Sequence, residues 1–188
     1  MAKITTSNFQ KGLFIEFKND IHQIAEFKHV NPGKGSAFVR TKLKNIRTGN
    51  TLEFTYKSGE AVKQLPVYIR EMQYLYKNNS HHIFMDQKSF EQYLLSEVVT
   101  GKFGQVLKEG EIYQVYVHES DAVGIRIPKR VSLKVVEAEE GIKGNTVTGA
   151  KKTVTTETGV KVQVPLFIKK GDVISIDPES GEYLERIN

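Results

Sequence analysis

The sequence predicts an all-β protein built of three small barrels, and three observations support this fold class. Apolar and polar residues alternate with a period near two along most of the chain, as they do in half-buried strands. The alternating segments are short and are separated by Gly, Asn, Asp or Pro turns, a pattern typical of small barrels. A sequence pattern also recurs after about 60 residues, which indicates repeated modules.

The first predicted pair of strands spans 24–30 and 36–43, where β-branched, aromatic and charged residues are mixed. Between them, Pro32 presets φ for the second position of a turn, and Gly33 supplies the positive φ that a type II turn needs next. Lys34 follows, so we expect it to project from the tip of a β-hairpin. A solvated turn lysine is the alternative interpretation of this residue.

Later segments continue the β pattern, with one exception. Further strands are predicted within 51–59, 110–120, 123–139, 160–168 and 172–187. The exception is Lys88–Val99, whose apolar residues have helical spacing and whose Ser89 is suited to cap a helix N-terminus. We therefore expect a helix at this place in the chain.

An internal repeat sets the predicted domain boundaries. Leu107–Val115 and Ile168–Ile176 share the order apolar, Lys, charged, Gly, acidic, apolar at an offset of 61 residues, and Pro66 and Pro128 are 62 residues apart. The predicted domains are 1–64, 65–127 and 128–188. Because each is near the lower size limit for independent stability, we expect neighbouring barrels to share an interface.

Positive charge is concentrated in the first module. The chain of 188 residues carries a net charge of +5, and residues 1–64 hold 11 Lys and Arg against 5 Asp and Glu. The other two modules are close to neutral. The first module is therefore the part expected to meet a polyanion, since localised cations attract phosphate backbones.

Composition excludes several classes of protein. The sequence has no cysteine, which excludes disulfides, thiolate zinc sites and cysteine nucleophiles. Its hydrophobic content of 39% and charged content of 26% are typical of a globular protein, and no apolar run is long enough to cross a bilayer. The N-terminus lacks an apolar signal core. We therefore expect a cytoplasmic protein without a membrane partner.

Catalytic motifs are missing from the sequence. It has no phosphate-binding GxxxxGK[ST] loop, no HExxH, no GxSxG and no cluster of metal ligands. His81 and His82 are adjacent in a polar turn that enters a strand, so they should point to opposite faces, and we interpret both as surface histidines. The sequence thus predicts neither an enzyme, nor a metal site, nor a bound cofactor.

A basic strand follows the predicted tip. Arg40, Lys42 and Lys44 alternate with uncharged residues, so a strand here would place all three cations on one face. Such a row can follow a phosphate backbone, where it would position RNA rather than read its bases. The alternative is a solvent-facing strand whose lysines discourage aggregation.

Three motifs resemble bacterial elongation factor P: "NPGKGSAFVRTKLKN" at the predicted tip, "ETGVKVQVPLFIKKGD" in the third module and "SGEYLERI" at the end. The resemblance covers all three modules and implies an L-shaped protein, with an N-terminal SH3-like (KOW-type) barrel followed by two OB-fold barrels. It also implies a monomeric translation factor that binds both ribosomal subunits between the peptidyl and exit tRNA sites. There the factor would relieve stalls at consecutive prolines, whose ring restricts the geometry of peptide transfer, by helping to position the reactants.

The resemblance assigns roles to the tip residues. Lys34 matches a lysine that, in one branch of the family, receives a β-lysyl extension from a ligase resembling a lysyl-tRNA synthetase; hydroxylation of the same residue stays open. The extended amine would reach toward the CCA end of the peptidyl tRNA. Pro32, Gly33 and Gly35 complete the tip, and the glycines would leave room for the ligase and the ribosome. Other branches of the family carry a rhamnosylated arginine or a different lysine extension.

The resemblance also concerns residues that would face RNA. Arg40, Lys42 and Lys44 match a basic strand expected to face tRNA. A loop directed at the small subunit would comprise Gly144, Asn145 and Thr146. The family often has Gly-Asp-Thr there, and asparagine keeps the carbonyl acceptor but loses the charge, which puts the codon-region contact in doubt.

Three alternatives compete with this interpretation. The first is the elongation-factor-P-like paralogue, which has the same fold. The second is an OB- and KOW-type RNA-binding protein that acts on transcripts or on ribosome assembly. The third is an enzyme, for which the sequence provides no set of catalytic residues.

Overall fold

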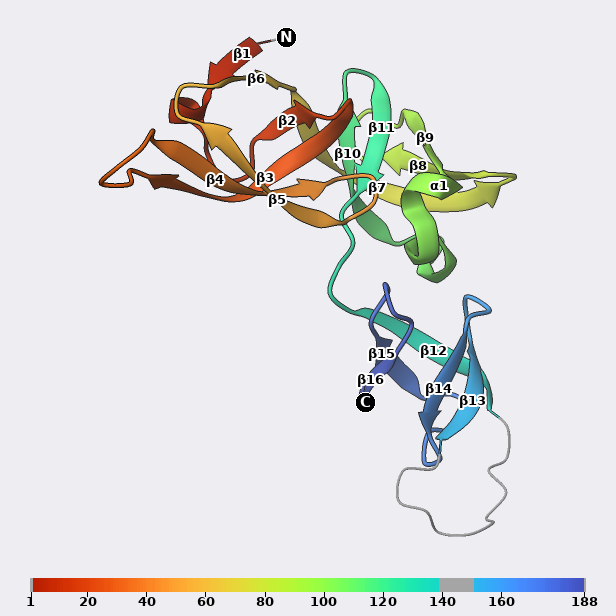
Figure 1. Cartoon of the computed structure of the whole chain (residues 1–188). Helices are drawn as coiled ribbons and strands as arrows, with labels where there is room; N and C mark the ends of the chain where they lie inside the picture. The colour runs from red at the N-terminus through yellow and green to blue at the C-terminus, as the bar shows by residue number, and fades with distance from the viewer. Residues whose placement is uncertain (1, 139–150, 188) are drawn as a thin grey trace. The chain divides into compact units, whose positions relative to one another are not determined.

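The computed structural model describes residues 2–138 and 151–187, and strands make up most of them. The chain forms two compact units (Figure 1), which are Met1–Thr100 with Ile112–Arg126, and Gly101–Glu111 with Ile127–Asn188. Its strands form three antiparallel, barrel-like sheets. The predicted all-β fold class is therefore confirmed.

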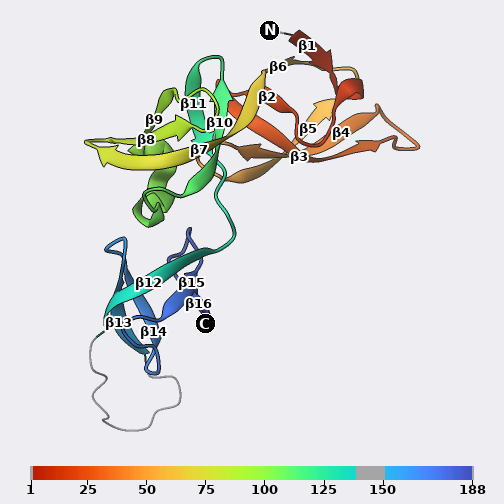
Figure 2. The same ribbon diagram turned by 180° about the vertical axis from the view of Figure 1, so that it is seen from behind.

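The first sheet has six strands in the order β1-β6-β2-β3-β4-β5 and curls strongly (Figures 1 and 2). The strands are β1 (Ala2–Thr5), β2 (Phe14–Phe17), β3 (Asp20–Val30), β4 (Phe38–Asn45), β5 (Thr51–Lys57) and β6 (Ala61–Gln64). A 3-10 turn, η1 (Thr6–Asn8), follows β1. Strands β2 to β5 are consecutive neighbours, so short turns connect them.

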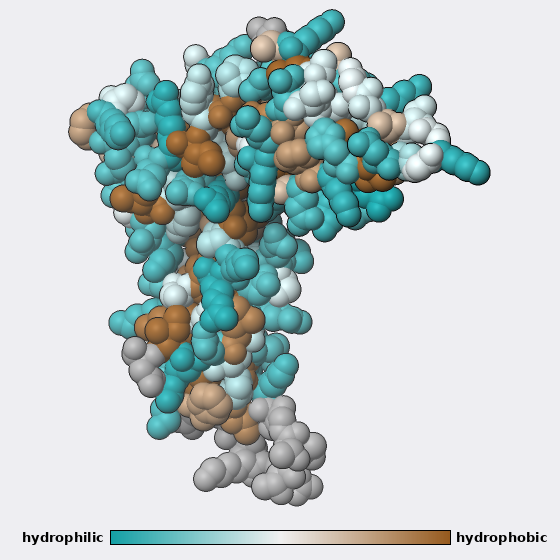
Figure 3. All heavy atoms as spheres, turned by 90° about the vertical axis from the view of Figure 1, so that its left-hand side faces the viewer, coloured by the Kyte–Doolittle hydropathy of each residue, from teal (hydrophilic) through white to brown (hydrophobic). Residues whose placement is uncertain are grey.

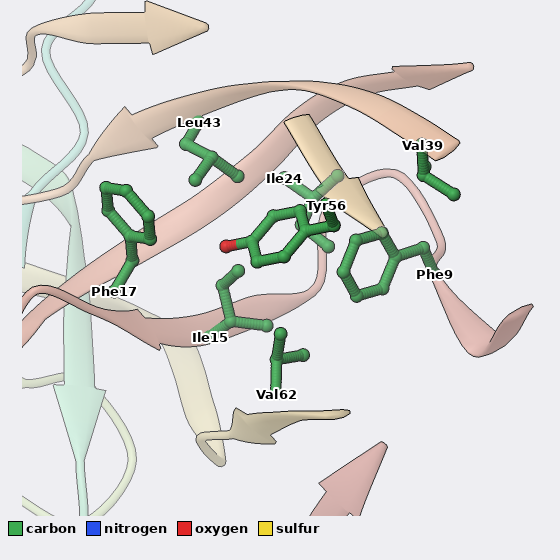
Figure 4. Close-up of a cluster of buried hydrophobic side chains, with 8 residues drawn as sticks. All are labelled: Phe9, Ile15, Phe17, Ile24, Val39, Leu43, Tyr56 and Val62. Carbon is green, nitrogen blue, oxygen red and sulfur yellow. The ribbon is translucent and has the colours of Figure 1, made fainter. Parts of the chain in front are cut away.

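The interior of this sheet is filled by eight apolar side chains, which Figure 4 shows as sticks: Phe9, Ile15, Phe17, Ile24, Val39, Leu43, Tyr56 and Val62. Tyr56 lies among them, with its ring centroid 5.5 Å from that of Phe9 and 4.7 Å from that of Phe54. Its hydroxyl is buried without a hydrogen-bond partner among the described residues. Burial, and secondarily the charge of Glu60, raises the pKa of Tyr56 to about 12.

The second sheet has five strands in the order β11-β10-β7-β8-β9. They are β7 (Val67–Asn78), β8 (His81–Asp86), β9 (Gln92–Ser96), β10 (Ile112–His118) and β11 (Asp121–Ile125). A single helical turn, α1 (Glu97–Thr100), and a 3-10 segment, η2 (Gly101–Val106), lie between β9 and β10. Met72, Phe84 and Leu95, all fully buried, come from three adjacent strands and form the interior of this sheet.

The helix predicted at Lys88–Val99 is wrong for most of its length. Asp86 Oδ1 accepts hydrogen bonds from the backbone amides of Lys88 and Ser89, which ends β8 in a turn. Phe90 then takes a positive φ of 60°, which a helix does not allow, and β9 pairs with β8. Sheet pairing therefore overrides the helical spacing of the apolar residues.

The third sheet has five strands in the order β14-β13-β12-β15-β16. They are β12 (Val131–Ala138), β13 (Lys151–Thr156), β14 (Lys161–Pro165), β15 (Val173–Ile176) and β16 (Tyr183–Ile187). Numbered within each sheet, the second and third sheets both run 5-4-1-2-3. The repeated sequence pattern ends in the fourth strand of each sheet, β10 and β15, so the two repeats occupy equivalent positions.

The first two sheets meet in an apolar cluster. Phe14 and Tyr116 pack edge to face with ring centroids 5.7 Å apart, and Ile46 completes the buried part of the cluster. Gly124 on β11 approaches the same place so closely that a Cβ would lie 2.7 Å from the carbonyl oxygen of Ile46. The expected interface between neighbouring barrels is confirmed for this pair, and its backbone contact requires a glycine.

One face of the molecule is mostly polar (Figure 3). In the face displayed in Figure 3, hydrophilic residues dominate and hydrophobic residues form separate smaller patches. Among residues 2–138 and 151–187, no helix has the length and apolar character needed to cross a membrane.

Candidate nucleic-acid interface

The hairpin of β3 and β4 carries the predicted tip. The two strands pair antiparallel from His22 opposite Asn45 to Val30 opposite Phe38, and residues 31–37 connect them. In Figures 1 and 2 this connection lies at the end of the first sheet that points away from the second sheet. Lys34 is exposed in the middle of it, as expected for the tip of a hairpin.

At the tip, the positive φ predicted for one glycine is found at the other. Gly33 was expected to have a positive φ, but the left-handed residue is Gly35, with a φ of +108°. A Cβ at Gly33 would meet no heavy atom within 4 Å. Pro32 is partly buried and would lie 3.9 Å, through its Cγ, from a Cβ at Gly35. The backbone therefore needs a glycine at position 35, whereas the fold gives no reason for one at position 33.

The basic strand has the predicted orientation. Arg40, Lys42 and Lys44 point outward from β4, and the residues between them, Val39, Thr41 and Leu43, are buried. The hydroxyl of Thr41 is satisfied because it donates to the backbone oxygen of Phe54 at 2.8 Å. The alternation of the sequence therefore sets which face of the strand carries the charge.

The middle cation of this row is already paired within the protein. Lys42 Nζ lies 2.9 Å from Glu26 Oε2 on β3, and the register places Glu53 of β5 opposite Lys42 on its other side. The hydrogen bond and charge of Glu26 raise the pKa of Lys42, and Lys42 in turn lowers the pKa of Glu26. This part of the surface therefore presents little uncompensated positive charge.

Two further cations, which the sequence did not indicate, flank Arg40. The register places Lys28 of β3 directly opposite Arg40, and Lys57 of β5 opposite Phe38, two residues before Arg40. Paired residues on neighbouring strands share a face, so Lys28, Arg40 and Lys57 all point outward near the tip. Within the described chain, none of the three forms an ion pair. Lys28 and Lys57 are recognised only once the register of the paired strands is known.

Lys44 lies in a third row of the same face, farther from the tip. Its register partners are Gln23 on β3 and Thr51 on β5, both uncharged. Lys44 is partly buried, and within the described ranges no carboxylate forms an ion pair with it. Lys44 therefore stands as a single cation among neutral neighbours.

Other residues singled out in the sequence lie elsewhere. Gly144, Asn145 and Thr146 are outside the described residues. The interpretation of both histidines as surface residues is wrong for His82, which is 2% exposed, whereas His81 is partly exposed. The two point to opposite faces of β8, as predicted, and the inward face is the core.

The surroundings of His82 are those of a core residue. His82 Nδ1 lies 3.3 Å from the hydroxyl oxygen of Tyr74, and burial, with a smaller contribution from the charge of Lys77, lowers the pKa of the imidazole. In the described parts of the chain, no three His, Asp or Glu side chains are grouped so that they could hold a metal ion.

Family models match along the chain in three successive stretches. They are described as the elongation factor P KOW-like domain at residues 5–62, the elongation factor P OB domain at residues 67–125 and the elongation factor P C-terminal region at residues 131–186. Elongation factor P of Moorella thermoacetica is 49% identical over 183 residues, which cover 97% of this chain and 99% of the relative. A solved structure, eukaryotic translation initiation factor 5A from Methanococcus jannaschii, is similar with a TM-score of 0.50 at 16% identity, over 66% of this chain and 94% of that one. At this identity the structural likeness concerns the fold alone.

Proposed function

The chain belongs to the elongation factor P family, and from this premise we propose that it binds the ribosome between the peptidyl and exit tRNA sites. It acts there as a translation elongation factor that stimulates peptide-bond formation at consecutive prolines. The observation that carries this proposal is the exposed position of Lys34 in the connection between two long paired strands. A long cationic side chain at such a tip can enter a site that a barrel cannot.

The chemistry at the stall is performed by the ribosome in this proposal. Proline reacts slowly because its ring restricts the approach of the reacting groups. Lys34, extended by a β-lysyl group, reaches toward the CCA end of the peptidyl tRNA and limits its motion. Holding reactants in a productive geometry lowers the entropic part of the barrier without any new catalytic group.

The partners follow from the same proposal. They are both ribosomal subunits, the peptidyl tRNA and a ligase resembling a lysyl-tRNA synthetase, which recognises the exposed tip. The outward cations of β4 support contact with RNA, because a row of this kind suits phosphate oxygens. The protein acts in the cytoplasm as a monomer, in which no side chain of its own performs catalysis.

Reconstituted translation of a message with consecutive proline codons tests the proposed function. We expect the modified protein to shorten the pause, and Lys34→Ala to abolish the effect while leaving the melting temperature unchanged, since Lys34 is exposed. A message without consecutive prolines serves as the control and should be translated equally by both proteins. Equal relief of the pause by Lys34→Ala would contradict the proposed mechanism.

Intact-mass measurement of the protein from its own organism tests the modification. We expect added mass on the peptide that contains Lys34. Fragmentation of that peptide distinguishes a β-lysyl extension alone from one accompanied by hydroxylation. A wholly unmodified Lys34 in growing cells would contradict the β-lysyl assignment.

A further inference from the structure

We propose that Lys28 and Arg40, with Lys57 beside them, form a binding seat for one backbone phosphate of RNA. This inference rests on the proposed function and names the residues through which the first sheet contacts tRNA. It replaces a uniform basic strand, Arg40, Lys42 and Lys44, with a compact site that spans three strands near the tip.

The seat is built from two like charges that face each other. Lys28 and Arg40 are directly opposite in the register of β3 and β4, where Cβ atoms lie about 5 Å apart. Both side chains are exposed. Lys57 is diagonal to Arg40 across β4 and β5, at a separation of about 7 Å that long side chains can bridge.

Like charges at directly opposite positions destabilise a sheet, so the pair needs a reason. Among the described residues no carboxylate forms an ion pair with Lys28 or Arg40. Glu26 shares their face and precedes Lys28 by two residues, but its carboxylate is held by Lys42 at 2.9 Å. An anion bound between the two cations would remove the repulsion.

The neighbouring row shows the opposite charge pattern. Lys42 lies between Glu26 and Glu53, so this row alternates in charge and carries one more carboxylate than it has cations. Uncompensated positive charge on this face therefore lies in the seat, close to the tip, and at Lys44 on the far side of the Lys42 row. The same sheet face thus separates a binding part from a structural part.

An RNA phosphate fits the seat better than an acidic peptide does. The guanidinium of Arg40 can donate two parallel hydrogen bonds to phosphate oxygens, and the ammonium groups can add point charges from either side. The first module also holds the excess of positive charge of the chain, with 11 Lys and Arg against 5 Asp and Glu in residues 1–64. We therefore expect a contact that positions RNA and does not depend on its sequence.

Salt-dependent binding of the full chain to ribosomes that carry peptidyl tRNA tests the seat. Lys28→Gln and Arg40→Gln should each weaken binding about tenfold and lower the slope of log affinity against log salt by about one. Lys44→Gln is the matched control, because it removes one positive charge from the same face in the row whose partners are neutral. It should weaken binding less than threefold, as expected when a single exposed charge is lost. Equal effects of all three variants would overturn the seat.

A double variant tests whether one phosphate is shared. Because Lys28 and Arg40 contact the same group in the proposal, Lys28→Gln with Arg40→Gln should lose much less than the product of the single effects. Losses that multiply would show two independent contacts and would overturn a common seat.

A charge reversal gives a readout that a merely structural lysine would not produce. Lys28→Glu should pair with Arg40 and raise the melting temperature by about 2 °C, while it weakens ribosome binding more than Lys28→Gln does. A lower melting temperature, or unchanged binding, would overturn the proposal. Gain of stability with loss of binding is the expected signature.

Two further arms separate the possible failures. If the wild-type protein does not bind ribosomes, the proposed function is wrong. If the wild-type protein binds and the Lys28 and Arg40 variants bind equally well, only the proposed seat is wrong. Competition with polyglutamate and with free tRNA identifies the occupant. Displacement by tRNA that depends on Lys28 supports RNA, and displacement by polyglutamate alone would assign the seat to an acidic protein segment and overturn the proposal.

Discussion

Lys42 and Glu26 form an ion pair of 2.9 Å across the ladder of β3 and β4, on the sheet face that also carries Lys28, Arg40 and Lys44. The pair is exposed on both sides, so solvent screens it and its contribution to stability is small. For the proposed contact with RNA the ion pair matters more, because Lys42 would have to break it before binding a phosphate.

Releasing Lys42 should therefore strengthen RNA binding. We expect Glu26→Gln to raise the affinity for ribosomes about threefold and to steepen the salt dependence by up to about one unit of slope, since one more cation becomes available. Titration of binding at several salt concentrations measures both effects. Glu71→Gln, an exposed carboxylate on β7 of the second sheet, is the matched control and should leave the slope unchanged. An unchanged slope in Glu26→Gln would mean that Lys42 does not meet RNA in either state.

Gly33 offers a test of crowding at the tip. A Cβ there meets no heavy atom within 4 Å, so Gly33→Ala should leave the melting temperature unchanged. We expect it nevertheless to slow modification of Lys34 or relief of proline stalls about tenfold, because the tip enters a confined space in the proposed function. Ser36→Ala, also exposed in the 31–37 connection, is the control. Full activity of Gly33→Ala would show that the space around the tip tolerates a methyl group.

Tyr56 should make the first sheet sensitive to alkaline pH. Its pKa is raised to about 12 from an ordinary 10.0, so well below pH 10 the phenol is neutral in both folded and unfolded chains. Between pH 10 and 12 the unfolded chain loses this proton first, and the free energy of unfolding should fall by about 2 kcal/mol as the pH rises. Denaturant unfolding followed across this pH range measures the effect.

Tyr56→Phe is the matched variant for this dependence. The buried hydroxyl has no hydrogen-bond partner in the described structure, so its removal should raise the free energy of unfolding by about 1 kcal/mol at neutral pH. It should also remove the contribution of Tyr56 to the alkaline loss of stability. A variant that is much less stable than the parent at neutral pH would imply a partner for the hydroxyl.

Gly124 should be intolerant of any side chain. A Cβ would lie 2.7 Å from the Ile46 carbonyl oxygen and 3.2 Å from Tyr116 Cδ2, so Gly124→Ala must shift backbone at the junction of the two sheets. We expect a loss of about 1–3 kcal/mol in the free energy of unfolding. Thermal unfolding checks this, with Gly33→Ala as the glycine-to-alanine control in open space. Equal melting temperatures for the two variants would refute the close approach.

The sequence correctly predicts which residues point inward and outward where this depends on the alternation within a single strand. In β4, strict alternation correctly places Val39 and Leu43 inside and Arg40 outside. The equivalence of the second and third sheets was also visible, as a repeated pattern that enters β10 and β15. Strand order within the sheets was not, because it depends on contacts between distant segments.

Lys28 escaped sequence reasoning for a physical reason. A β-bulge between Ile24 and Glu26 inserts one residue into β3 and reverses the alternation beyond it. A regular strand would put Ile24 and Lys28 on the same inner face, but the bulge turns Lys28 outward to meet Arg40. Such irregularities follow from pairing with a neighbour, and a single sequence does not reveal them.

The contact of Gly124 with the Ile46 carbonyl has a mechanical consequence for the tip. Because backbone meets backbone at this point, no rotamer change can lengthen or shorten the junction between the first two sheets. The second sheet then holds the hairpin that carries Lys34 at a set distance. In the proposed function, a group attached to Lys34 would extend the reach of the hairpin, so the modification would change the length of this side chain as much as its charge.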